Sequence, residues 1–467
     1  MKFSLLNSLG LTLLPCAALA LDISNANGTD SRVCDIISRD VCVIGGGSSG
    51  TYAAIRLREE GKSVVVIEKT GRLGGHTDTY TDPVTGVKVD YGVVVFHNET
   101  LVRDYFARFN ISMVAAALDG TVPVTTLYYD LRTGTLSSYV PGDPSAGLAA
   151  YGAELAKYPY VETGFDLPDP VPQDLLLPFG DFAQKYSAIQ SAVPLIFSFA
   201  QGLGDLLAQP TLYVFKNFGS DILQMLATNG FIVTAVHDNS LLYERAAVSL
   251  GPDVLFNSAI IAMQRGDDTA QIDIKTNAGT VQANCEKVLV TIPPKLNNLN
   301  GFDLSPEELQ LFGQFGNSGY YTGLIRNSGI PNNVSVQNHG DDTPYNLTPL
   351  PGPYAFSYTA SPDLLDVKYG SNTSLSDDFV KADILQSLER IQLPGKDTSA
   401  VPEFAAFASH TPFELTVSAE AISNGFYRDL YALQGQRGTY YTGAAFHTHD
   451  SSLLWQFTEA LLPLIVA

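Results

Sequence analysis

The sequence predicts an α/β fold, α+β over the whole chain, and three observations carry this prediction. A β–α–β pattern occupies residues 39–68, and its two strands are almost wholly apolar. Such strands are expected where helices cover both faces of a parallel sheet. Strands and hairpins return at 230–297, and 415–467 ends as a strand, a Gly turn and an amphipathic helix. The segment 113–229 is rich in Pro, Tyr and Leu with helical patches, and 298–414 is polar and contains Pro. We therefore expect one domain assembled from 39–112, 230–297 and 415–467, interleaved with a second domain of mixed sheet and helices.

Length and composition set the broad class of the protein. A chain of 467 residues is long enough for two domains with their own cores. Hydrophobic residues make up 45% and charged residues 16%, which is typical of a globular protein. The formal net charge of -21 argues against binding to nucleic-acid phosphates.

The first twenty residues, "MKFSLLNSLGLTLLPCAALA", have the pattern of a secretory signal peptide. One Lys precedes a short apolar run, and small residues around Ala20 fit a cleavage site. A retained anchor is the alternative, but the run is short for a membrane span. No later segment is long and apolar enough to cross a bilayer, so we predict a secreted protein.

Sequons and cysteines agree with passage through an oxidising compartment. Of the four cysteines, Cys16 would be removed with the signal peptide. The remaining Cys34, Cys42 and Cys285 can form at most one internal disulfide. Cys42 lies within a predicted buried strand, where a small free core residue is the expected role. Six Asn-X-Ser/Thr sequons predict a glycoprotein, and they begin at Asn27, Asn98, Asn110, Asn333, Asn346 and Asn372.

The predicted β–α–β unit consists of two apolar strands and one helix between them. "DVCVIGG" (40–46) is a short apolar strand, and "SSGTYAAIRLREEGK" (48–62) follows as a helix. Ala53, Ala54 and Leu57 share its inward face, and Gly61 ends it. "SVVVIE" (63–68) is the next buried strand.

The turn between the first strand and the helix, "GGGSSG" (45–50), carries a dinucleotide fingerprint. Gly45, Gly47 and Gly50 have G-x-G-x-x-G spacing between a strand and a helix, and Glu68 ends the next strand, as in a Rossmann-type unit. The helix N-terminus offers N–H groups and partial positive charge to phosphates. Glu68 is expected to accept hydrogen bonds from a ribose.

The same stretch has an alternative interpretation as a hydrolase nucleophile elbow. Gly46, Ser48 and Gly50 match G-x-S-x-G, which also occupies a strand-to-helix turn. The first strand is an unusual place for that elbow, and a triad does not explain Glu68. The Ser48 hydroxyl is therefore expected to donate to a phosphate.

The loop after Glu68, "KTGRLGGHTDTY" (69–80), distinguishes between cofactors. An acid followed by a Gly-Gly pair and a Thr resembles the GG motif of the flavin amine-oxidase superfamily. The resemblance implies FAD, with Gly74 and Gly75 letting the backbone pass close to the isoalloxazine and Arg72 offsetting phosphate charge. The superfamily usually has Arg or Lys after the glycines, whereas this chain has His76.

Three further segments resemble cofactor segments of the same superfamily, and the whole layout resembles its secreted fungal FAD-dependent oxidoreductases. They are "VDYGVVVFH" (89–97), "NSAIIAMQR" (257–265) and "YYTGAAFHTHDSSLLWQF" (440–457). The last implies a Gly turn and a helix start whose N–H groups meet the flavin. The predicted cofactor-binding residues are Gly45, Gly47, Ser48, Ser49, Gly50, Glu68, Lys69, Arg72, Gly74, Gly75, His76, Gly92, Ala259, Gly443, Ser452 and Leu453.

The resemblance also bears on the reaction. Amine oxidases of the superfamily often carry a Lys that holds a water against flavin N5, and "YYTGLIR" (320–326) places Gly323 there. Tyr440 aligns with a Tyr that flanks the substrate face of the flavin; a core aromatic is the alternative. A base for proton removal would be His76 or His97.

No metal is predicted, because "HTHD" (447–450), the nearest candidate, lacks a clear third ligand. Covalent flavin attachment is not expected, since no Cys lies in the C-terminal segment; attachment through His76 is the alternative.

We therefore predict a secreted FAD-dependent oxidoreductase that removes a hydride from a small hydrophobic molecule by C–C or C–N dehydrogenation, with molecular oxygen as a candidate acceptor. The alternatives are a flavin-dependent double-bond isomerase of an unsaturated lipid, an amine oxidase using oxygen, and a flavin-stabilised binding protein without turnover.

Overall fold

A computed structural model of the protein describes residues 35–117 and 123–467. The predicted signal peptide, Asn27 and Cys34 lie outside these residues. The described residues form one compact unit. Two seven-stranded sheets organise it, and a division into the two predicted domains remains a prediction.

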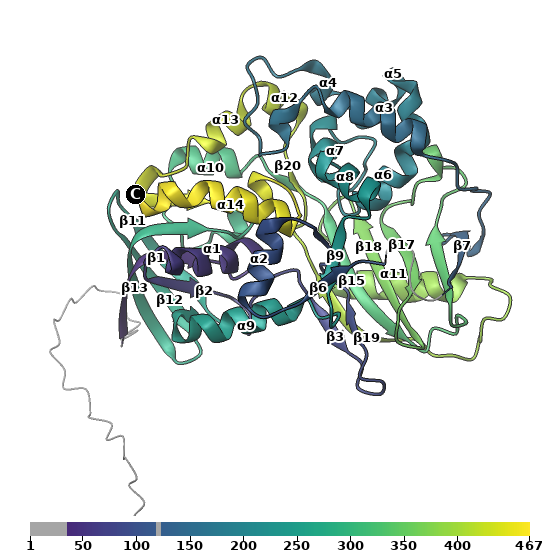
Figure 1. Ribbon diagram of the computed structural model, residues 1–467, viewed down its shortest axis with the longest axis horizontal. Coiled ribbons are helices and arrows are strands. Elements are labelled where there is room, and N and C mark those ends of the chain that lie inside the picture. Colours follow the sequence, from purple (N-terminus) through teal and green to yellow (C-terminus); the bar gives the residue numbers. More distant parts are fainter. Residues whose placement is uncertain (1–34, 118–122) are drawn as a thin grey trace, which may run out of the picture. The chain divides into compact units, whose positions relative to one another are not determined.

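The first sheet contains the predicted β–α–β unit (Figure 1). Its strands are β1 (Asp35–Ile44), β2 (Val64–Ile67), β10 (Val254–Leu255), β11 (Ala259–Arg265), β12 (Ala270–Thr276), β13 (Gly279–Val290) and β21 (Thr439–Tyr441). β1 lies between β2 and β13 and is parallel to both, and β21 pairs with the end of β13. All three segments expected in the first domain therefore contribute strands to this sheet.

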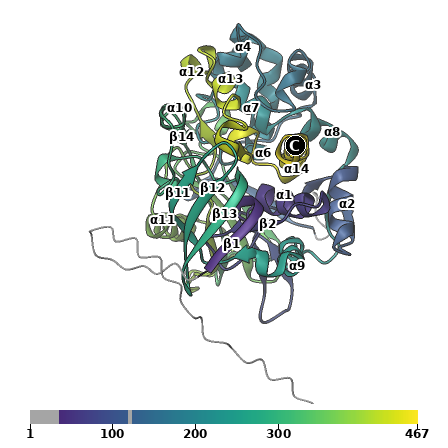
Figure 2. The ribbon, with the colours of Figure 1, turned by 90° about the vertical axis from the view of Figure 1, so that its left-hand side faces the viewer.

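Helix α1 (Ser48–Glu59) packs on this sheet as the sequence predicts. Ala53, Ala54 and Leu57 are fully buried, and Gly61 lies just beyond the helix end with a left-handed φ of 81°. The C-terminal helix α14 (Ser451–Val466) lies beside α1 on the same side of the sheet (Figure 2). Helices α2 (Thr100–Arg108) and α9 (Ser240–Leu250) complete this layer.

The second sheet has the strand order β19-β15-β18-β17-β16-β7-β8. Helix α11 (Asp377–Arg390) buries Val380, Ile384 and Leu388 against it. All its strands fall within 113–229 and 298–414: β7 (Thr125–Asp130), β8 (Thr135–Leu136), β15 (Gly319–Arg326), β16 (Val334–Asn338), β17 (Gly352–Tyr358), β18 (Leu364–Ser371) and β19 (Glu403–Ser409).

Short helices between 145 and 228 form an aromatic-rich layer that shares one core cluster with the first sheet. They are α3 (Ser145–Leu155), α4 (Gln173–Leu176), α5 (Phe179–Lys185), α6 (Val193–Phe199), α7 (Thr211–Asn217) and α8 (Ser220–Thr228). The remaining helices are α10 (Pro306–Phe312), α12 (Ala419–Ser423) and α13 (Phe426–Tyr431). Among the residues that the structure describes, none of the helices is long and apolar enough to span a membrane.

Small strand pairs connect these layers. β3 (Thr79–Thr81) pairs with β4 (Lys88–Asp90), and β14 (Gly316–Asn317) pairs with β20 (Leu415–Thr416). β9 (Phe231–Thr234) lies between β5 (Phe96–His97) and β6 (Met113–Ala115).

One expectation about the core was wrong. Cys42 is not a free core residue but forms a disulfide with Cys285, with the Cα atoms 5.8 Å apart. The two cysteines are 243 positions apart in the chain and lie on the adjacent strands β1 and β13. The pairing of these strands depends on the sheet topology, which cysteine spacing alone does not determine.

Candidate active site

Backbone hydrogen bonds join the glycine fingerprint, the acid and the Gly-Gly loop into one frame. The Gly46 N–H donates to Glu68 Oε2 at 2.7 Å, and the Gly74 N–H donates to the Gly46 carbonyl at 2.8 Å. The other Glu68 oxygen accepts from the Thr70 N–H at 2.8 Å. The Glu68 side chain is therefore fixed at the end of β2, beside both glycine loops.

Two close approaches explain why glycine is needed around this frame. A Cβ added to Gly50 would lie 2.0 Å from the Gly45 carbonyl oxygen, so α1 could not start this close to β1 with any side chain there. A Cβ added to Gly92 would lie 2.1 Å from the His76 carbonyl oxygen. Both glycines therefore keep backbone segments in direct contact.

The start of α1 is open to a ligand. Its N-cap is Gly47, so no side chain caps the first turn, and a Cβ on Gly75 would lie 3.1 Å from the Gly47 Cα. Uncapped N–H groups and the helix dipole favour an anion at this point. Ser48 and Ser49 lie in this first turn.

The start of α14 meets the start of α1. The Ser48 hydroxyl donates to Ser451 Oγ at 3.0 Å and accepts from Trp455 Nε1 at 3.0 Å. Asp450 caps α14 by accepting from the Leu453 N–H at 3.1 Å. The Leu453 N–H, which the sequence predicts to meet the flavin, therefore donates to Asp450 instead. The Ser452 hydroxyl accepts a hydrogen bond from the His97 N–H at 3.1 Å.

The remaining predicted cofactor residues surround the same frame. The Ser258 N–H donates to the Glu68 carbonyl at 2.9 Å, which brings Ala259 beside the acid. Gly443 lies in the turn after β21 with φ 109°. Lys69 is exposed.

Arg72 is engaged within its own loop. Its guanidinium donates to the Gly75 carbonyl at 2.9 Å and to the Thr77 carbonyl at 3.1 Å, and it pairs with Asp78. A phosphate contact from Arg72 therefore stays a prediction.

Beside the frame lies a group of stacked rings, which we call the ring stack: His76, His410, Phe413, His449 and Tyr320. The ring centroids of His76 and His410 are 4.3 Å apart and nearly parallel. Those of Phe413 and His449 are 3.9 Å apart, and those of Tyr320 and Phe413 are 4.7 Å apart. The five residues come from four separate parts of the chain.

Burial keeps the imidazoles of the ring stack neutral. It lowers the pKa of His76 well below its usual range, lowers that of His410, and lowers that of His449 to about 3. His410 Nε2 lies 3.3 Å from Asp78 Oδ2. A neutral imidazole can accept a proton, and the Asp78 carboxylate partly offsets the effect of burial by favouring the protonated form of His410.

A buried acid lies next to the ring stack. Glu414 Oε2 is 3.7 Å from His449 Nε2, and Glu414 Oε1 accepts from Asn217 Nδ2 at 3.1 Å. Burial raises the pKa of Glu414 to about 7. Near neutral pH this carboxyl group therefore exchanges a proton readily.

Known proteins of similar sequence decide the family. A family model described as an NAD(P)-binding Rossmann-like domain matches residues 43–109. The "FAD-dependent oxidoreductase oblC" of Cochliobolus heterostrophus is 42% identical over 457 residues, which cover 94% of both chains. The "Beta-cyclopiazonate dehydrogenase" of Aspergillus oryzae is 36% identical, again over 94% of each chain. The chain belongs to this family of fungal FAD-dependent oxidoreductases.

Solved structures show that the oxidoreductase has the fold of flavin amine oxidases. A fatty acid isomerase from P. acnes superposes with a TM-score of 0.74 at 18% identity, covering 92% of this chain and 99% of the other. A putrescine oxidase superposes with a TM-score of 0.65 at 16% identity, covering 92% and 100%. The predicted fold class, family and cofactor are confirmed.

The geometry of the oxidoreductase fits FAD. The open start of α1 suits a pyrophosphate, and Glu68 at the end of β2 suits a ribose. His449 and Asp450 lie deep in the fold, yet 13% and 25% of their side chains remain exposed.

The position of Tyr440 differs from the sequence expectation. It packs in the core cluster of α1 and α14, and its hydroxyl donates to the Leu464 carbonyl at 2.7 Å. It is not part of the ring stack, so the structure favours the alternative of a core aromatic. Phe413 instead lies beside His76, and Tyr320 lies beside Phe413; sequence reasoning had selected neither.

His97 also lies apart from the ring stack. Its side chain is 1% exposed, and its Nε2 is 3.1 Å from Asp450 Oδ2. Burial opposes a charge on His97, but Asp450 and Glu99 outweigh this effect and raise its pKa to about 10. A protonated imidazole is not a base, so of the two predicted bases only His76 is neutral.

The nucleophile-elbow alternative loses support in the oxidoreductase. Among the described residues Ser48 forms no hydrogen bond to a histidine, so the nucleophile elbow lacks its base. Gly323 lies within β15, and a Cβ there would be 3.2 Å from both the Ala406 carbonyl and the Phe404 ring. A lysine at this position would therefore need its neighbours to move.

Proposed function

We propose that this oxidoreductase removes a hydride from a small hydrophobic molecule held against the ring stack. Bound FAD supplies the hydride acceptor. The supporting observation is the ring stack itself, whose aromatic and neutral imidazole faces suit a flat apolar substrate better than a charged one. The printed names of its relatives, oxidoreductase and dehydrogenase, support C–C or C–N dehydrogenation.

We assign the removal of a substrate proton to His410. Asp78 lies at hydrogen-bonding distance from its Nε2, which orients the ring and stabilises the protonated form. His76, the base expected from sequence, stacks against His410 and has no such carboxylate partner among the described residues. Positioning of the donor carbon supplies most of the rate of a hydride transfer, and the rings of the stack provide that positioning.

We also propose the cofactor contacts that the frame supports. Glu68 accepts from the ribose, the start of α1 binds the pyrophosphate, and Gly74, Gly75 and Gly92 allow backbone close to the flavin. These assignments rest on the frame and on the deep position of the ring stack beside it.

We propose further that the protein is secreted and glycosylated. The Cys42–Cys285 disulfide is typical of an oxidising compartment. The sequon asparagines Asn98, Asn110, Asn333 and Asn372 are exposed, as modification requires. Asn346 is half-buried and its side-chain nitrogen donates to the Gly340 carbonyl, so it is the least suitable acceptor.

Anaerobic bleaching against a panel of apolar amines, enones and indoles tests the function. The purified protein should release FAD on denaturation, and one compound of the panel should bleach its flavin absorbance. His410→Asn should slow bleaching by about 10²-fold or more without loss of FAD, whereas His339→Asn, a histidine outside the ring stack, should not. Bleaching that is as fast in His410→Asn would contradict the assigned base.

A double-bond isomerase is the second candidate, favoured by the absence of a lysine at Gly323. It would convert an unsaturated lipid under anaerobic conditions without net bleaching. An amine oxidase would consume oxygen with amines only.

A further inference from the structure

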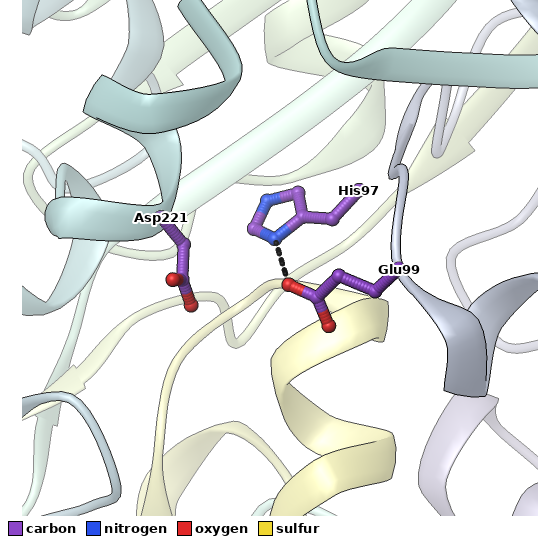
Figure 3. Close-up of side chains that lie close together, drawn as sticks. All are labelled: His97, Glu99 and Asp221. Carbon is purple, nitrogen blue, oxygen red and sulfur yellow. Dashed lines mark ion pairs between the residues drawn. The ribbon is translucent and has the colours of Figure 1, made fainter. Parts of the chain in front are cut away.

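A cluster of ligand-type side chains, one buried and two half-buried, lies at the start of α2. His97 ends β5, Glu99 is the N-cap of α2, and Asp221 is in the first turn of α8 (Figure 3). One oxygen or nitrogen from each residue lies within 4.8 Å of the others, and His97 Nδ1 is 3.6 Å from Glu99 Oε1. We call these three residues the acid–histidine cluster.

Carboxylates approach both ring nitrogens of the imidazole in this cluster, but without the geometry of a hydrogen bond. The His97 side chain is 1% exposed, and neither ring nitrogen has a hydrogen-bond partner of acceptable geometry. A buried polar atom without a hydrogen bond destabilises the folded state, so such atoms are rare in native structures. The ring edge that carries Nδ1 points toward the two carboxylates (Figure 3).

The cluster also carries excess negative charge. Within residues 35–117 and 123–467, Glu99 and Asp450 form ion pairs with His97 alone, and Asp221 forms none. Three carboxylates therefore lie around one imidazole, and a bound divalent cation would offset their negative charge.

We propose that His97, Glu99 and Asp221 bind a divalent first-row transition-metal ion of the Zn²⁺ class. One imidazole and two carboxylates form a mixed nitrogen–oxygen donor set that suits this class, with water completing the coordination. Ligand atoms around tetrahedral zinc are about 3.4 Å apart, so the observed separations need only small side-chain rotations.

Asp450 has a positioning role in this site. Its Oδ2 is 3.1 Å from His97 Nε2, on the ring nitrogen that does not face the cluster. A carboxylate behind a ligating histidine fixes the ring orientation and strengthens the ligand. Because Asp450 also caps α14, the ion connects β5, α2 and α8 to the start of the C-terminal helix.

The test uses the full chain without an affinity tag, loaded with FAD and stripped of metal by a chelator. Titration with ZnCl₂ by calorimetry, checked by elemental analysis after gel filtration, should give one Zn²⁺ per chain. Asp221→Asn should weaken Zn²⁺ binding by at least about tenfold, and Asp450→Asn by about 10- to 100-fold. The FAD content of each variant, read from its absorbance, reports whether it has folded.

Asp181→Asn is the matched control, because Asp181 also lies in the first turn of a helix but is exposed and distant in sequence from the cluster. It should bind Zn²⁺ like the wild type. If Asp221→Asn loses FAD as well, Glu99→Gln takes its place. Wild-type protein that binds no Zn²⁺, or Asp221→Asn and Glu99→Gln that bind it as tightly as Asp181→Asn, would overturn the proposal. Neither result depends on turnover of any substrate.

Discussion

At the scale of single residues, environment rather than residue type decides which titratable groups can act. The oxidoreductase has seven histidines. Burial keeps those of the ring stack neutral, whereas carboxylates keep His97 charged. Burial likewise raises the pKa of Glu414 to about 7, although Asn217 donates a hydrogen bond to its carboxyl group.

Glu68→Gln should weaken FAD binding by about tenfold or more, because the neutral amide accepts a ribose hydrogen bond less strongly than a carboxylate does. Titration of apoprotein with FAD, followed by flavin fluorescence, measures the change. Glu60→Gln, an exposed glutamate at the end of α1, is the control and should leave FAD affinity unchanged. Equal affinity for FAD in both variants would remove Glu68 from the site.

Glu414 should make stability depend on pH. Its folded pKa of about 7 lies above the unfolded value, so its contribution is fully present below about pH 4.5 and is lost as pH rises through 7. The loss amounts to roughly 3 kcal/mol. Glu414→Gln stays neutral, so its Tm relative to wild type should rise between pH 5 and pH 8.

Thermal melts of both proteins across this range measure the effect. Glu420→Gln, which changes an exposed glutamate, should keep the wild-type profile. A constant Tm difference between Glu414→Gln and wild type would mean that the folded pKa is not raised.

At the scale of elements, the site depends on two helix starts and two glycine loops that touch. α1 begins uncapped, whereas α14 is capped by Asp450, and the Ser48 hydroxyl connects them. The N–H groups at an uncapped helix start can bind a phosphate, whereas N–H groups at a capped start already donate to the capping side chain. The two helices therefore differ in what they can offer a cofactor, although both begin with serines.

Gly50→Ala should displace α1 and abolish FAD retention, because the new methyl group would lie 2.0 Å from the Gly45 carbonyl oxygen. FAD content after purification and the Tm report the two effects. Gly152→Ala is the control: Gly152 lies within α3, and its nearest contact would be 3.4 Å away. Alanine favours a helix by up to about 1 kcal/mol over glycine, so this variant should keep FAD and melt no lower than wild type.

At the scale of the whole molecule, distant parts of the chain are joined across the first sheet. β1, β13 and β21 come from the beginning, the middle and the end of the sequence and lie side by side. The Cys42–Cys285 disulfide links two of them across 243 positions. A bridge over so long a segment restricts the unfolded chain strongly.

Removing the disulfide should lower the free energy of unfolding by several kcal/mol, within the usual range of about 2–5 kcal/mol. Cys42→Ala, Cys285→Ala and the double variant should be destabilised to a similar extent, because any one of them breaks the same bond. Chemical unfolding with and without reductant measures this. If the losses of unfolding free energy in Cys42→Ala and Cys285→Ala add up in the double variant, this would argue against a bond between the two cysteines.

The sequence by itself determined the first β–α–β unit, the cofactor and the family. These depend on local patterns: an apolar strand, G-x-G-x-x-G at a helix start, an acid after the next strand, and a Gly-Gly loop. Ala53, Ala54 and Leu57 are buried as their helical spacing predicts. Local backbone geometry is encoded by neighbouring residues, so it can be read from one stretch of chain.

Tertiary structure alone decided which side chains meet. His410, Phe413 and Tyr320 join His76 from distant segments, and isolated residues in loops show no periodic pattern that would have selected them. Tyr440 matched a local motif, yet it packs in the core. The disulfide and the acid–histidine cluster likewise combine residues far apart in the chain. Such contacts depend on strand order and helix packing, which many sequence segments determine together.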